Sequence, residues 1–197
     1  MVRTKLPSIK TPIGIQFRVD GTLADGAGMA KVAGAEFQMA FNIPAMRAML
    51  KGTRANGQPL NEIRVFADEY AWNEAQEGRG ATAAMNTLND RLPLLKLTPF
   101  GAMWSVIEAE GHTTVTKTAD GKTVLTGTSP YDGIEVSITV EDSRQHVKLG
   151  PYDPTELVRL PVAVTAKANG HVWGATFADY RGDLEPNVWF IFPTTMK

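Results

Sequence analysis

One segment, residues 91–107, interrupts an otherwise β-like pattern and so limits the folds open to this chain. Its sequence, RLPLLKLTPFGAMWSVI, is strongly apolar and helix-leaning, whereas the other legible segments alternate between apolar and polar residues. Thr98 followed by Pro99 indicates a helix N-terminus, because threonine caps free backbone N–H groups and proline at the first helical position needs no N–H partner. We therefore expect a helix from Pro99 to about Ala109.

A second helical piece is predicted just before this one. Between residues 81 and 97, apolar side chains recur at spacings of three and four, at Met85, Leu88, Leu92 and Leu95. Pro93 lies inside that pattern and predicts an end or a kink of the helix near Arg91. The sequence thus predicts a helical insertion over about residues 81–109, in two pieces joined at residues 93–98.

Period-2 alternation on both sides of the insertion predicts β-strands. The expected strands are residues 13–20, 36–50 with an interruption at Pro44, 63–66 and 71–74 before it, and 113–117, 123–128, 134–140, 146–149, 157–165, 172–177 and 187–192 after it. Hairpin turns are expected at Asp68-Glu69, Asp120-Gly121 and Asn169-Gly170. Residues 21–28 are rich in glycine and aspartate and predict a loop. Within it, Gly26-Ala27-Gly28 lacks the third glycine and following helix of a phosphate-binding loop, so a hairpin turn is the better interpretation.

These elements add up to an α+β fold. We expect a curved antiparallel sheet of about ten strands, a half-barrel, with a helical cover inserted between two runs of strands. A length of 197 residues fits one domain, which we place at residues 13–197 after an N-terminal segment of residues 1–12.

Charge and composition exclude several classes of function. The formal net charge is −1, from 20 basic and 21 acidic residues, so no global field attracts nucleic acid or anionic membrane. The chain has no cysteine, which excludes disulfides and thiolate chemistry. Residues 1–10 lack the apolar run of a secretory signal, and no stretch approaches the roughly 20 apolar residues that span a bilayer. Met1 is either a natural start or a replacement for an export signal, so localisation in the periplasm or cell envelope depends on such a signal.

The sequence supports neither a metal site nor a catalytic centre. His112, His146 and His171 are scattered over strand or turn positions without metal-ligand spacing. Ser105 lies inside the predicted helix with no base in view, and a G-x-S-x-G motif is absent. Carboxylates are spread along solvent faces, so a catalytic pair is neither located nor excluded. We expect no enzyme activity, cofactor or metal.

The apolar insertion must bury itself against the sheet, and two interpretations remain open. Its side chains either plug the concave face as ordinary core, or line a cavity for an apolar ligand in which methionines adapt to variable shapes. A void of several hundred Å³ beneath Trp104 and Leu95 would favour the cavity. Arg47 is likewise open: either a solvated strand arginine, or an inward arginine at a cavity mouth that donates to carbonyls of the helical cover. The candidate ligand-binding residues are Phe37, Met39, Phe41, Arg47, Trp72, Leu92, Leu95, Phe100, Met103 and Trp104.

The order of these elements resembles the bacterial outer-membrane lipoprotein carriers, the LolA-like fold. Residues 41–47 (FNIPAMR) resemble a strand entry of that family, and residues 65–73 (VFADEYAWN) resemble its next hairpin. Thr98-Pro99-Phe100 falls where its helical cover is expected, and residues 173–181 with 190–193 resemble its closing strands. Residues 70–74 and 97–101 are closer still to a group of uncharacterised bacterial exported proteins.

This resemblance implies a half-barrel that binds a lipid or a lipoprotein acyl chain in the cell envelope, with Arg47 at the position of the arginine that holds the lid. The carriers have a helix before the first strand, whereas about a dozen residues precede Ile13 here. Part of the lid is therefore expected to be missing. The rival expectation is a protein-interaction or envelope-sensor domain with a filled core; the oligomeric state is left open.

Overall fold

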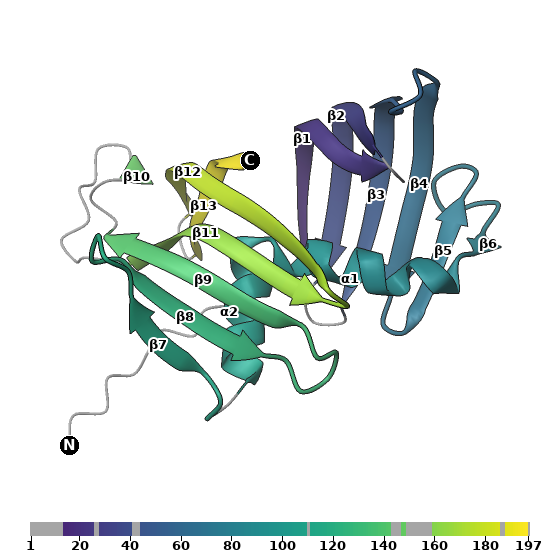
Figure 1. Cartoon of the computed structure of the whole chain (residues 1–197). Coiled ribbons are helices and arrows are strands. Elements are labelled where there is room, and N and C mark those ends of the chain that lie inside the picture. Colours follow the sequence, from purple (N-terminus) through teal and green to yellow (C-terminus); the bar gives the residue numbers. More distant parts are fainter. Residues whose placement is uncertain are drawn as a thin grey trace.

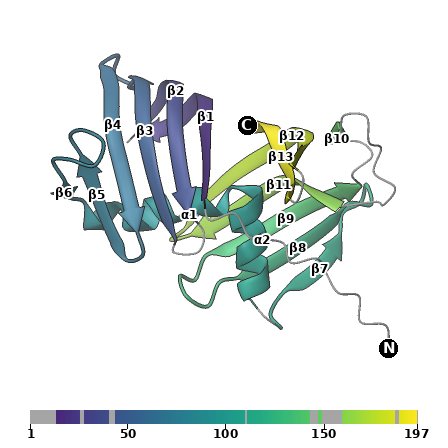
Figure 2. The same cartoon turned by 180° about the vertical axis from the view of Figure 1, so that it is seen from behind.

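The computed structural model describes residues 14–25, 28–40, 44–109, 111–142, 147–148, 159–185 and 188–196. Over these residues the chain is an α+β protein with two open sheets and two short α-helices (Figure 1). Figure 2 shows the same arrangement from behind, with the first helix lying between the two sheets.

The first sheet contains the six N-terminal strands, hydrogen-bonded in sequence order as an antiparallel meander. The strands are β1 (Gly14–Asp25), β2 (Gly28–Ala40), β3 (Ala45–Thr53), β4 (Pro59–Ala67), β5 (Tyr70–Glu74) and β6 (Thr82–Ala83). Strands β1 and β2 stay paired as far as Asp25 and Gly28, which confirms the hairpin at that position. The loop predicted over residues 21–28 is wrong, because β1 continues to Asp25 after a register shift between Val19 and Gly21.

The second sheet has the order β10-β12-β11-β9-β8-β7, and β13 pairs with β12 outside this path. Its strands are β7 (Thr114–Lys117), β8 (Thr123–Thr128), β9 (Glu135–Asp142), β10 (Val147–Lys148), β11 (Arg159–Ala168), β12 (His171–Glu185) and β13 (Val188–Met196). All pairs are antiparallel except the short parallel pair of β10 with β12. The alternation predicted for residues 134–140 is confirmed, because Ile134, Val136, Ile138 and Val140 are buried and the residues between them are not.

The predicted turns are confirmed by the strand registers. Ala67 pairs with Tyr70 across Asp68, and Ala168 pairs with His171 across Asn169-Gly170. Asp68, Asn169 and Gly170 have φ values of 53°, 50° and 77°, the left-handed region that tight hairpin turns require. Strands β7 and β8 are joined by a longer turn that contains Asp120-Gly121, since Lys117 pairs with Thr123.

The helical insertion consists of a 3₁₀ turn η1 (Met85–Thr87), helix α1 (Leu88–Lys96) and helix α2 (Pro99–Glu108). Thr98 caps α2 as predicted, since its hydroxyl accepts a hydrogen bond from the Gly101 N–H and Pro99 occupies the first turn. The predicted end of the helix near Arg91 is wrong, because α1 runs through Pro93 and ends at Lys96. Pro93 is fully buried, so packing outweighs the one backbone hydrogen bond that proline removes.

Helix α1 is packed against both sheets. It contacts β4 of the first sheet and β11 of the second, while α2 lies on β8, β9 and β11. Each sheet has its own buried cluster, and Leu92 of α1 packs against both clusters. The two sheets are therefore joined through a shared helix.

Polar side chains fix α1 to the strands on either side. The Arg91 guanidinium donates through Nη1 to the carbonyls of Val65 and Trp72 and through Nη2 to Asn73 Oδ1, each over 2.7 Å. Lys96 Nζ lies 3.0 Å from Asp132 Oδ2, in the connection between β8 and β9. Both Arg91 and Lys96 are buried, so these contacts satisfy groups that have left water.

The expectation of one continuous ten-stranded sheet is not confirmed. The two runs of strands form separate sheets, and no described strand of the first sheet pairs with a described strand of the second. The physical reason is the insertion itself, since η1, α1 and α2 follow β6 directly and α1 packs between the two runs.

The cap of α2 gives a first prediction. In Thr98→Ala, the Gly101 N–H and the Leu95 carbonyl lose the buried Thr98 hydroxyl as their partner. We expect the free energy of unfolding to fall by about 1–2 kcal/mol, measured by urea denaturation. Thr116→Ala, at an exposed position of β7, is the matched control and should change stability by less than about 0.5 kcal/mol. Equal effects of the two substitutions would contradict the capping role.

Candidate functional site

A cavity of about 370 Å³ lies between the two sheets, next to the junction of α1 and α2. Strands β1, β2 and β3 form one wall, β12 and β13 form the other, and the C-terminal end of α1 lines the space between them. Its lining residues are Phe17, Val19, Asp20, Gly21, Thr22, Leu23, Val32, Phe37, Met39, Leu50, Leu94, Leu97, Thr98, Gly174, Ala175 and Met196. We call this space the inter-sheet cavity.

The lining of the inter-sheet cavity is mainly apolar. Among the described residues that form it, Asp20 is the one that carries a charge. Thr98 also lines it, but its hydroxyl is already engaged by Gly101 and Leu95. The rings of Phe17 and Phe37 stack with centroids 5.4 Å apart and planes at 8°, which fixes a flat apolar surface on the first sheet.

A smaller hollow of about 290 Å³ adjoins the inter-sheet cavity. The two share Phe17, Val19, Asp20, Thr98 and Met196, and the hollow adds Arg18, Pro99 and Pro193. Asp20 brings a negative charge to its wall, and its Oδ1 accepts a hydrogen bond of 2.5 Å from the Gly34 N–H. The Arg18 side chain is 80% exposed and its Nε lies 3.8 Å from Glu36 Oε2, so its charge faces solvent. The two spaces together thus have an apolar part and a polar part.

The structure distributes the predicted ligand-binding residues over several environments. Phe37 and Met39 line the inter-sheet cavity. Leu92 packs against both buried clusters, and Leu95 and Phe100 pack in that of the first sheet. The inter-sheet cavity is lined by Leu94 and Leu97, and not by Trp104 or Leu95, beneath which a void would have favoured a ligand cavity.

Met103 and Trp104 lie on the outer face of α2. Their exposed fractions are 36% and 42%, so they contribute to neither buried cluster, and the Trp104 indole N–H donates to Glu108 Oε1. The remaining apolar candidate, Phe41, lies outside the described residues. Cavity residues that the sequence reasoning missed include Phe17, Val19, Leu94, Leu97 and Met196. The alternation of residues 13–20 already placed Phe17 and Val19 on one face and was the available signal.

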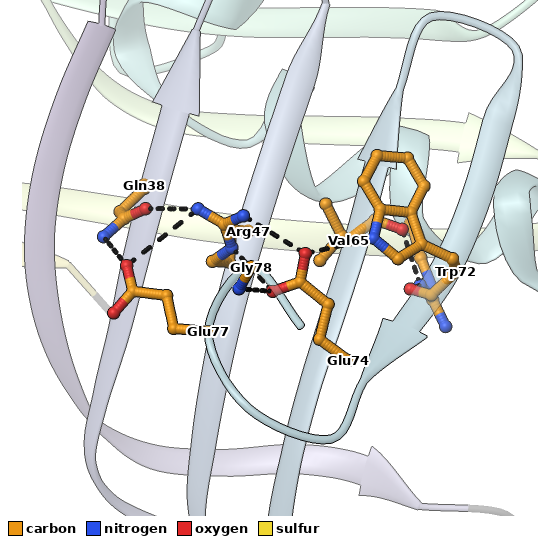
Figure 3. A network of polar contacts seen from close by, with 8 residues as sticks. Gln38, Arg47, Val65, Trp72, Glu74, Glu77 and Gly78 are labelled. Carbon is orange, nitrogen blue, oxygen red and sulfur yellow. Dashed lines mark hydrogen bonds and ion pairs between the residues drawn. The ribbon is translucent and has the colours of Figure 1, made fainter. Parts of the chain in front are cut away.

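Arg47 belongs to a polar network on the opposite face of the first sheet (Figure 3). Its Nε and Nη2 each lie 3.1 Å from one oxygen of Glu74, a two-point ion pair, and Nη1 donates to Gln38 Oε1 over 3.2 Å. The interpretation that Arg47 donates to carbonyls of the helices is therefore wrong. The arginine that joins helix and sheet is Arg91, which lies on the helix and donates to the strands.

Glu74 is the buried centre of this network. Its carboxylate also accepts hydrogen bonds from the Trp72 indole over 3.1 Å and from the Gly78 N–H over 2.7 Å. Burial acts to raise the pKa of Glu74, but the hydrogen bonds from Arg47, Gly78 and Trp72 outweigh it, so the pKa lies below the ordinary value of 4.5. Arg47 and Trp72 also border an open hollow of about 550 Å³ at the end of the sheet. The charge of Arg47 is already matched there by Glu74.

Two further features bear on function. Within the described ranges, no cluster of three or more histidine, aspartate or glutamate side chains is arranged to hold a metal ion, and His146 lies outside these ranges. Among the described residues, no helix combines the length and the apolar character that crossing a membrane requires.

Comparisons of this chain with protein-family models, with curated proteins and with solved structures found no match.

The ion pair of Arg47 with Glu74 gives a second prediction. In Glu74→Gln, Arg47 loses its carboxylate, and we expect the free energy of unfolding at pH 7 to fall by about 2 kcal/mol. Because the folded-state pKa of Glu74 is lowered, its contribution is fully present above about pH 4.5 and is lost as pH falls through the folded-state pKa. The stability difference between wild type and variant should therefore shrink below about pH 4.5.

Glu77→Gln is the matched control for this experiment. Glu77 Oε1 lies 4.0 Å from Arg47 Nη1 and its side chain is 58% exposed, so the change should cost less than about 0.5 kcal/mol. Denaturant titrations of the three proteins between pH 3 and pH 7 provide the measurement. A pH-independent difference between wild type and Glu74→Gln would contradict the assignment.

Proposed function

We propose that this protein binds a hydrophobic or lipid-like ligand in the inter-sheet cavity, without catalysis, and acts in the bacterial cell envelope. The observation that carries the proposal is the cavity itself, with a volume of about 370 Å³ and mainly apolar walls. Ligand sites typically have volumes of roughly 300–1,000 Å³, apolar linings and a few polar groups that orient the ligand. The inter-sheet cavity fits this description.

The walls of the cavity favour binding over simple incomplete packing. Protein interiors are close-packed and contain few voids larger than a water molecule, so an apolar space of this size needs an occupant or a solvent-exposed mouth. Two methionines, Met39 and Met196, lie on opposite walls, and their flexible thioether side chains can follow ligands of different shape.

The envelope assignment rests on the resemblance to the LolA-like carriers. In this proposal the two open sheets are the two walls of a half-barrel, and α1 and α2 form its helical cover. Lipoprotein acyl chains or other lipids are then the ligand class, and export from the cytoplasm is part of the proposal.

The alternative is a protein-interaction or envelope-sensor domain that binds no small ligand. The observation that favours it is the outer face of α2, where Met103, Trp104 and Ile107 are exposed at spacings of one, three and four residues. Under this alternative, filling the inter-sheet cavity would have no effect on function.

Filling the cavity from within is the test. Gly21 pairs with Val32, which lines the cavity, and a Cβ built at Gly21 meets no atom within 4 Å. A side chain at Gly21 lies on the same face as Val32, so Gly21→Phe should take up space in the cavity and weaken binding of an uncharged naphthylamine dye at least tenfold. Ala33→Phe, at an exposed position of β2, is the matched control and should leave dye binding unchanged.

Dye fluorescence titrations measure both variants, and circular dichroism establishes that both are folded. Absence of dye binding to the wild-type protein, or equal binding by wild type and folded Gly21→Phe, would overturn the proposal.

A further inference from the structure

We propose that the inter-sheet cavity holds one hydrocarbon chain of about 12 carbons, and that the ligand is a single-chain amphiphile whose polar head lies in the adjoining hollow. This inference rests on the proposed function and narrows it, because lipids with two or three chains are excluded from the site.

The size of the cavity sets the number and length of the chains. If a methylene takes roughly the 30 Å³ that a water molecule occupies in the liquid, about 370 Å³ holds about 12 such groups. That amount is one medium-length chain. Two chains of the same length would need about twice the volume, which the inter-sheet cavity does not provide.

The helices fill the neighbouring space. Leu95 of α1 is buried in the cluster of the first sheet, while Ala102 and Val106 of α2 are buried in the cluster of the second. The helices therefore fill the space next to the inter-sheet cavity. The cavity itself is bordered by β1, β2, β3, β12 and β13, and by Leu94 and Leu97.

The adjoining hollow is suited to a head group and not to a second chain. Its wall carries the charge of Asp20, and it meets the inter-sheet cavity at Phe17, Val19 and Met196. Hydrocarbon placed there would desolvate the Asp20 carboxylate without replacing its hydrogen bonds. A head with a cationic group matches this site, since the cation finds an opposite charge in Asp20.

The experiment compares lipids that share one zwitterionic head. Monoacyl glycerophosphocholines with chains of about 8 to 16 carbons are titrated below their micelle concentrations, with dye displacement as the measurement. Each buried methylene should strengthen binding about fourfold. We expect the affinity to rise by that factor up to about 12 carbons and then level off. Diacyl glycerophosphocholines with the same chain lengths should bind at least tenfold more weakly than the monoacyl forms.

Two variants change the length limit in opposite directions. Leu97→Ala removes three side-chain carbons from the wall, and the affinity plateau should move to chains about two or three carbons longer. Gly21→Leu adds a side chain where a Cβ has open space, and the plateau should move to shorter chains by a similar amount. Ala33→Leu, on the exposed side of β2, should leave the plateau unchanged.

The outcomes separate this inference from the proposed function. A plateau near 12 carbons that shifts in both variants supports the single-chain site. Affinity that rises steadily through 16 carbons, or diacyl lipids that bind as tightly as monoacyl ones, overturns the inference and leaves hydrophobic binding standing. Absence of binding by dye and by every lipid overturns the proposed function and this inference together.

Discussion

Helix α1 is the constraint on which the rest of the structure depends, because both sheets use it as a shared wall. Leu92 packs on both buried clusters, Arg91 fastens the helix to β4 and β5, and Lys96 with Asp132 fastens its end to the second sheet. Burial lowers the pKa of Arg91, and Nε of this side chain has no hydrogen-bond partner among the described residues. Arg91 therefore remains a buried cation. Its three acceptors, two backbone carbonyls and the Asn73 side chain, hold α1 in one position.

The inter-sheet cavity follows from the unequal packing of the two helices. The inner face of α2 is built from small residues, and a Cβ added to Gly127 of β8 would lie 2.8 Å from the Ala109 Cβ. This close approach draws α2 onto the second sheet, whereas α1 stays with β4 and β11. Strands β1, β12 and β13 receive no such cover at their facing edges, so the space between Phe17 and Met196 stays open. Small side chains on α2 thus affect the packing around the neighbouring cavity.

Local signals in the sequence predicted local structure well. The Thr98 cap, the hairpin turns and the alternation of residues 134–140 depend on neighbouring residues, and the structure confirms them. Pro93 shows the limit of such local signals, since its burial between the sheets outweighs a backbone preference.

The division into two sheets depends on where a helix packs, and strand alternation carries no information about that. Arg91 was missed for the same reason: only the position of α1 brings it to the carbonyls of Val65 and Trp72. Phe37 and Met39 were among the ligand-binding candidates predicted from the sequence. The structure shows that Leu94 of α1 and Met196 of β13 line the same cavity.

Each sheet is made from one continuous stretch of chain, and this order matters during synthesis. All six strands of the first sheet leave the ribosome before α1, yet their buried cluster is completed by Leu88, Leu92 and Leu95 of the insertion. The apolar face of the first sheet is therefore exposed in the nascent chain until residue 95 has emerged, and unpaired strand edges in such species promote aggregation. Helix α1 joins the two sheets in the folded protein. During synthesis, its emergence also determines when the apolar face of the first sheet can be covered.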